Sequence, residues 1–266
     1  MPMALDTASA PGWYGKLSTL GDFASRRLEP DWIHACDEWL AHCMQASHAQ
    51  LGPQWLDTYL SAPVWRFAWA PGVVDRRWWF GVLMPSCDNV GRYFPLVVVQ
   101  PRDRPPTDRI GLDHLELWWN QAAGSALHTL QEHTSLDEFE AALSSLPPWP
   151  GVRGHAEVQR AAVDDRLKVT GSGHASALDL MAGWAGQDLL EKLAGCSIWW
   201  PMAQPGHTPA LTAIQGLPEP QRFADLLQGH WEARWRIRHR FRDRCGHRPG
   251  ARPTVACEAR CLPATA

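Results

Sequence analysis

Three short apolar runs, separated by turn-forming residues, follow one another between residues 64 and 99. They occupy Val64–Trp69, Trp78–Met84 and Tyr93–Val99, and they are rich in the aromatic and β-branched residues that favour strands. Each connection between them is too short for the crossover helix that a parallel pair would need. The stretch therefore predicts an antiparallel three-stranded meander. Because the runs are almost continuously apolar, we expect both faces of the sheet to be covered.

Segments with helical periodicity and further strand-like runs surround this meander. Apolar residues recur at three- and four-residue spacing after Pro30, a residue suited to a first helical position, and Ser135 and Glu138 have the spacing of a capping box. The section 152–178 carries no clear pattern. The expected helices cover residues 30–51, 111–130, 135–146, 175–193 and 220–228, and a short helix or turn is expected over 55–60. The expected further strands cover 12–17, 197–200 and 211–214. This order favours an α/β fold, with helices on both sides of a mainly antiparallel or mixed sheet.

Several motifs in a fixed order resemble the TagF (ImpM) family, accessory proteins of bacterial type VI secretion systems. The resemblance is dense from about Gly12 to Pro101 and looser beyond. The motifs that carry it are Gly12-Trp13-Tyr14-Gly15-Lys16-Leu17, Leu20-Gly21-Asp22-Phe23, Ala62-Pro63-Val64-Trp65-Arg66-Phe67, Gly81-Val82-Leu83-Met84-Pro85-Ser86 and Asp88…Gly91-Arg92-Tyr93-Phe94-Pro95-Leu96. The resemblance implies a three-layer α/β/α sandwich and a protein without family catalytic residues. It also implies a post-translational repressor of secretion that binds the forkhead-associated scaffold protein of the system.

The composition describes a folded domain with a distinct tail. We expect a TagF-like domain over residues 12–228 and an Arg-rich C-terminal tail over 229–266, where nine arginines outweigh three acidic residues. Six of the arginines alternate with other residues between Arg234 and Arg244. Such a tail could bind nucleic acid through phosphate contacts and stacking, dock an acidic protein, or be a disordered extension. Nucleic-acid binding is therefore kept as an alternative function and not as the expectation.

The N-terminus has no basic and hydrophobic signal segment, and no stretch approaches the roughly 20 apolar residues of a membrane helix. The chain has seven cysteines, an odd count without paired spacing, and Cys36, Cys43 and Cys87 lie among apolar residues. Reduced thiols fit a cytoplasmic protein, so we expect a cytoplasmic location without membrane insertion. The sequence does not indicate an oligomeric state.

The sixteen tryptophans are an unusual number for 266 residues. Large aromatic side chains are mostly buried, so we expect most of them to fill the core. Any that are exposed could anchor a protein partner, and Trp13, Trp78 and Trp79 are the candidates.

The sequence offers no complete motif for catalysis, a cofactor or a metal. The Gly15-Lys16 pair lacks the other residues of a phosphate-binding loop, because position 10 is Ala10 and position 17 is Leu17. The spacing of Cys245, His247, Cys257 and Cys261 matches no standard zinc site. We therefore expect no catalytic residue, cofactor or metal site, and a protein that is not an enzyme.

The loop between the second and third runs of the meander holds the main candidate site. In the structural interpretation, which we favour, Asp88 and Asn89 satisfy backbone donors and Gly91 takes a positive φ. In the functional interpretation, the loop contributes to an exposed polar patch that binds a protein partner. The residues of this patch are Lys16, Asp22, Arg26, Asp88 and Arg92. A further alternative is a small ligand-binding or enzymatic site near Asp22, Asp88 and Arg92.

Overall fold

A computed structural model describes residues 10–106, 109–131, 133–147, 159–163, 166–171, 176–202 and 210–229. The chain divides into two units, Met1–Trp231 and Glu232–Ala266, and the second lies entirely outside the described residues. The expected Arg-rich tail and its alternative roles therefore stay predictions.

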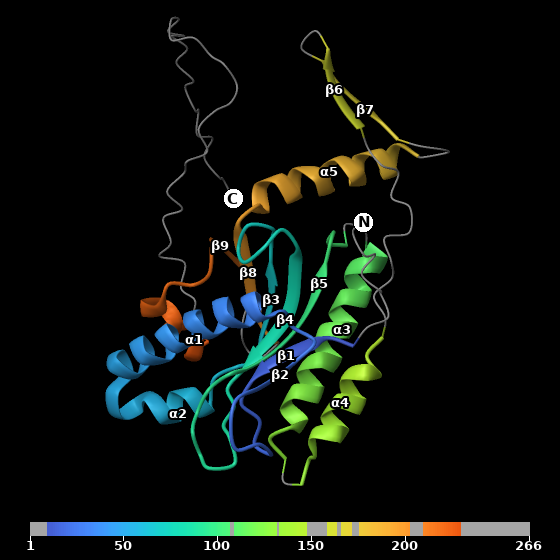
Figure 1. Cartoon of the computed structure of the whole chain (residues 1–266). Coiled ribbons are helices and arrows are strands. Elements are labelled where there is room, and N and C mark those ends of the chain that lie inside the picture. Colours follow the sequence, from blue (N-terminus) through green and yellow to red (C-terminus); the bar gives the residue numbers. More distant parts are fainter. Residues whose placement is uncertain are drawn as a thin grey trace, which may run out of the picture. The chain divides into compact units, whose positions relative to one another are not determined.

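A seven-stranded sheet in the order β2-β1-β5-β4-β3-β8-β9 forms the centre of the unit (Figure 1), and each neighbouring pair is antiparallel. Its strands are β1 (Gly12–Gly15), β2 (Ala24–Arg26), β3 (Trp65–Trp69), β4 (Trp78–Met84), β5 (Leu96–Arg102), β8 (Cys196–Pro201) and β9 (Thr212–Gln215). The antiparallel meander of β3, β4 and β5 is confirmed. The third strand begins later than predicted, at Leu96, because Phe94 bonds back to Ser86 within the loop and Pro95 has no N–H to donate.

Helices cover both faces of the sheet, so the three-layer α/β/α sandwich is confirmed (Figure 1). One layer contains α1 (Pro30–Leu51), α2 (Trp55–Leu60) and α6 (Phe223–Leu227), and the other contains α3 (Arg109–His128) and α4 (Leu136–Ser144). The predicted capping box at the start of α4 is present, with Ser135 accepting from the Glu138 amide. Helix α5 (Ala177–Leu193) packs Leu190 and Leu193 against the core on the α3 side. No helix among the described residues is long and apolar enough to cross a membrane.

Three strands lie where no strand was expected. Strand β2 has only three residues, and strands β6 (Gln159–Val163) and β7 (Arg166–Thr170) form a separate antiparallel pair within the section without a clear pattern. Neither segment carries the long apolar run that marks a central strand. Their sequences therefore resemble loops more than strands.

The alternation of side chains along β3 builds two different cores. Trp65, Phe67 and Trp69 face the α1 layer, whereas Val64, Ala68 and Ala70 face the α3 layer. The aromatic core under α1 also takes residues from the C-terminal part: the Trp65 indole donates to the Leu226 carbonyl at 3.0 Å. Most of the described tryptophans are buried, as expected. Trp13, Trp78 and Trp79 are buried as well, so they are not exposed anchors for a partner.

Candidate partner-binding site

Two loops meet at one end of the sheet, the β1–β2 loop (residues 16–23) and the β4–β5 loop (residues 85–95), as Figure 1 shows at the bottom of the view. They are neighbours because β1 and β5 pair with Gly15 opposite Leu96. Three hydrogen bonds to backbone carbonyls join them: Ser86 Oγ to the Lys16 carbonyl at 2.7 Å, the Asn89 amide to the Leu20 carbonyl at 3.0 Å, and Arg92 Nη2 to the Gly21 carbonyl at 2.5 Å. A fourth hydrogen bond joins the Lys16 and Asp88 side chains. The two loops therefore form one connected surface.

The Asp88 carboxylate is the centre of the contacts between the loops. Its Oδ2 lies 2.5 Å from Lys16 Nζ and 2.7 Å from Arg92 Nε, and its Oδ1 accepts from the amides of Val90 at 3.1 Å and Arg92 at 2.8 Å. Burial by itself raises the pKa of this carboxyl, but the hydrogen bonds from Lys16 and Arg92 outweigh it and hold the pKa well below its usual range. Gly91 takes the expected positive φ of 80°. The structural interpretation of this loop is thus confirmed for Asp88 and Gly91.

The expected exposed patch is wrong for two of its members. Asp88 and Lys16 are buried, with only 2% and 4% of their surface exposed, so a partner cannot contact them directly. Lys16 turns inward because the two loops close over it, and its ammonium lies 4.4 Å from the centre of the Phe23 ring. Asp22 and Arg92 are exposed, and their charged groups approach to 4.0 Å.

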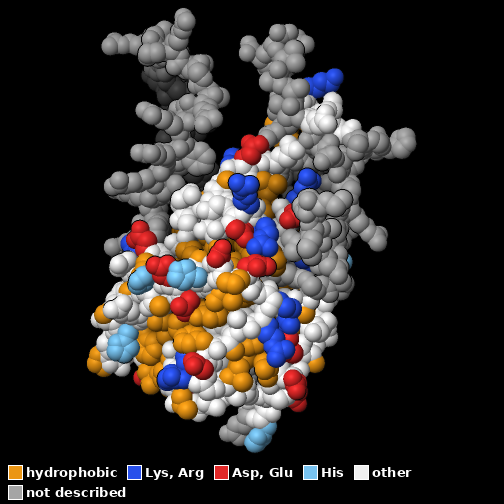
Figure 2. Space-filling view, in the orientation of Figure 1, with side chains coloured by type: hydrophobic (Ala, Val, Ile, Leu, Met, Phe, Trp, Pro, Cys, Tyr) orange, Lys and Arg blue, Asp and Glu red, His pale blue; other side chains and the backbone are white. Residues whose placement is uncertain are grey.

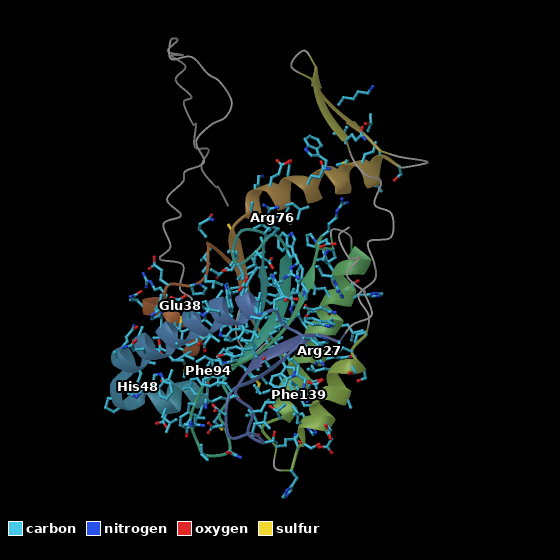
Figure 3. The ribbon with its side chains drawn as sticks, in the orientation of Figure 1. Arg27, Glu38, His48, Arg76, Phe94 and Phe139 are labelled. Atoms are coloured by element: carbon cyan, nitrogen blue, oxygen red, sulfur yellow. The ribbon has the colours of Figure 1, made fainter. Side chains whose placement is uncertain are left out.

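Arg26 does not join this group. It lies opposite Trp13 in the β1–β2 pair, and cross-strand partners share a face of the sheet. Trp13 belongs to the core on the α3 side, so Arg26 lies toward α4, where its Nε is 3.8 Å from Glu140 Oε1. Glu140 also accepts from Trp13 Nε1 at 2.5 Å and from Arg27 at 2.6 Å (Arg27 is labelled in Figure 3). Arg26 is therefore part of a separate contact between the sheet and α4.

Two apolar side chains that the sequence did not single out are exposed on the same loops. Phe23 is 44% exposed, and its ring stacks on Tyr14 at 6.0 Å and meets Phe94 edge-on at 4.8 Å (Phe94 is labelled in Figure 3). Val90, at the tip of the β4–β5 loop, is 68% exposed. Figure 2 shows apolar side chains exposed among charged ones in the lower part of the face that it draws. The residues Asp22, Phe23, Val90 and Arg92 are called the loop surface below.

The chemistry of this site fits binding better than acid–base catalysis. A general acid or base must exchange a proton near its operating pH, whereas the Asp88 carboxylate is buried and engaged by two cations.

An open depression of about 570 Å³ lies elsewhere, between α2 and the end of α6, and its lining residues are Gln54, Asp57, Thr58, Ser61, Leu227 and Gln228. Within the described ranges, no group of three or more His, Cys, Asp or Glu residues could hold a metal ion. The cysteines and histidine considered for zinc lie outside those ranges.

The low pKa of Asp88 predicts a pH effect on folding. Its pKa in the folded protein is below the value of about 3.9 for an unfolded chain, so its contribution to stability is complete above that value and is lost as the pH falls below it. Asp88→Asn should therefore lower the urea midpoint of unfolding at pH 6. At pH 3 the difference between the variant and the wild type should shrink. An equal difference at both pH values would contradict this assignment.

Two comparisons with known proteins give matches. The family model of the TagF N-terminal domain, described as type VI secretion system-associated, matches residues 12–146, just over half of the chain and including the whole loop surface. The crystal structure of PA0076 from Pseudomonas aeruginosa PAO1 is similar, with 32% sequence identity and a TM-score of 0.65. The match covers 93% of this chain and 100% of that one. No curated protein matches the chain significantly.

Proposed function

The chain belongs to the TagF family of type VI secretion-associated proteins, and from this membership we propose that it is a non-catalytic, post-translational repressor of such a system. In this proposal the protein acts in the cytoplasm, where it binds the forkhead-associated scaffold protein of the system and restrains its activation. Binding to the scaffold protein requires a complementary surface on each protein and a few anchoring residues, but no chemical step.

The loop surface is the observation that best supports a protein-binding role. It combines an exposed aromatic ring, an exposed apolar side chain and an exposed arginine, and aromatic residues and arginine are enriched in protein interfaces. The two loops are fixed to each other by the buried Lys16–Asp88 pair, so little conformational freedom is lost when a partner binds. A site that works by ligand binding or catalysis near Asp22, Asp88 and Arg92 has less support, since Asp88 is already engaged.

A binding experiment with the purified full chain and the scaffold protein of the same secretion system tests the proposal. We expect a complex in size-exclusion chromatography and saturable binding in calorimetry. A chain that ends at residue 228 should bind equally well, since the Arg-rich tail has no part in this mechanism. In cells, overproduction of the protein should lower export of a secreted substrate, and deletion of its gene should raise it. A folded protein that forms no complex with the scaffold would overturn the proposal.

A further inference from the structure

We infer that the loop surface recognises a carboxylate next to an apolar side chain on the partner protein: the carboxylate binds the outer edge of Arg92, and the apolar group packs on the exposed side chains of Phe23 and Val90. This inference rests on the proposed protein-binding function and adds to it the contact residues and the chemistry of the partner.

The hydrogen bonds of Arg92 leave one edge of its guanidinium available. A guanidinium has five N–H donors. Nε donates to Asp88 and Nη2 donates to the Gly21 carbonyl, whereas Nη1 bonds to no residue in the described part of the chain. The side chain is 57% exposed. The outer Nη1–Nη2 edge has the fork geometry that binds a carboxylate through two parallel hydrogen bonds.

The local charge balance favours an anion at this edge. Two cations, Lys16 and Arg92, share the single carboxylate of Asp88. The second carboxylate near Arg92 belongs to Asp22, but its side chain is 81% exposed and lies 4.0 Å from Nη2, beyond hydrogen-bond distance. An exposed pair of this kind contributes little and is easily exchanged. A carboxylate of the partner can therefore displace Asp22 from the guanidinium.

Phe23 is held in a fixed orientation on its inner side. Tyr14 stacks on the ring, Phe94 meets it edge-on, and the Lys16 ammonium lies 4.4 Å from its centre. Aromatic anchors that are ordered before binding lose little entropy in the complex. The exposed part of the ring and the Val90 side chain are thus suited to contact a partner's apolar group.

Lys16 and Asp88 act through these exposed residues as positioning residues. Lys16 contacts both the Phe23 ring and the Asp88 carboxylate, and Asp88 in turn holds the Arg92 guanidinium. One buried ammonium therefore connects both exposed anchors. Its role is to set their orientation, since it is too deeply buried to contact the partner.

Charge changes at Val90 test the inference without disturbing the buried contacts. We expect Val90→Glu to weaken binding of the purified scaffold protein at least tenfold. The new carboxylate, two residues from Arg92, would compete for the Arg92 guanidinium and repel the partner's carboxylate. Val90→Lys should keep the affinity within threefold or improve it. Phe23→Ala and Arg92→Lys should each weaken binding about tenfold, since they remove the apolar contact and the guanidinium fork. All affinities are measured by calorimetry, with thermal midpoints to verify that each variant is folded.

Arg26→Gln provides the matched control, because Arg26 is exposed to a similar degree but lies against Glu140. It should bind the scaffold as the wild type does. If wild-type protein binds while Val90→Glu and Val90→Lys have equal effects, or while Phe23→Ala has none, this inference is overturned and the proposed function stands. If the folded wild-type protein does not bind the scaffold at all, the proposed function fails and takes the inference with it.

Discussion

Lys16→Met is expected to lower the thermal midpoint of unfolding by roughly 10 °C. This is the size of shift that the loss of one partner from a buried ion pair causes in a protein of this length. The substitution leaves the Asp88 carboxylate buried with Arg92 as its remaining cation and removes the ammonium from the Phe23 ring. Differential scanning calorimetry at pH 7 measures the effect. Lys192→Met is the matched control: Lys192 is exposed on α5, so its loss should change the midpoint by no more than about 1 °C.

A double variant separates the ion pair from the shape of the site. Lys16→Met combined with Asp88→Asn removes both charges while the Asn oxygen can still accept from the loop amides. Its midpoint should lie above that of Lys16→Met alone, because a buried carboxylate that has lost one of its two cations costs more than a neutral pair. If Lys16→Met alone shifts the midpoint by 2 °C or less, the pair does not fix the loops. Because Asp88 holds the two loops together, alanine at both Asp88 and Arg92 would test folding and not the contact with a partner.

The pattern of the sequence predicted the parts of the fold that depend on local signals. The three central runs, the start of α1 at Pro30 and the capping box at Ser135 all follow from residues close together in the chain. Strand β2 has three residues, and its pairing depends on β1, so no local signal identifies it. A strand of this length is stabilised by its neighbour and not by its own composition.

The candidate site was predicted in part, for a physical reason. Asp88 as a loop residue with backbone contacts could be predicted, since Asx residues satisfy nearby amides. The burial of Lys16 could not, because lysine is almost never buried unless it is paired. Its partner lies 72 positions away in the sequence. The exposure of Phe23 could not be predicted either, because an aromatic side chain ordinarily predicts burial in the core. Here the ring packs on Tyr14 and Phe94 on one side, and 44% of the residue stays exposed.

A chain that ends at residue 146, the end of the matched family model, is expected not to fold. Strand β3 would lose its neighbour β8, which pairs with it from Trp65 opposite Pro201 to Trp69 opposite Ser197. The aromatic core under α1 would lose Trp199 and Phe223, both fully buried. Burying each such side chain contributes about 1.5–3 kcal/mol or more, and whole domains are stable by only 5–15 kcal/mol.

The comparison of three chains distinguishes the folding unit from the family-model boundary. Residues 1–146 should show no cooperative urea transition and should bind the dye ANS, whereas residues 1–229 and the full chain should unfold cooperatively at similar midpoints. The similar behaviour of the last two is expected because the described core ends at α6, whose Leu226 accepts from Trp65. A cooperative transition of residues 1–146 at the midpoint of the full chain would show that β8, β9 and α6 are dispensable. Otherwise the loop surface depends on residues more than 100 positions away, because the sheet that carries both loops is complete only when the C-terminal strands join it.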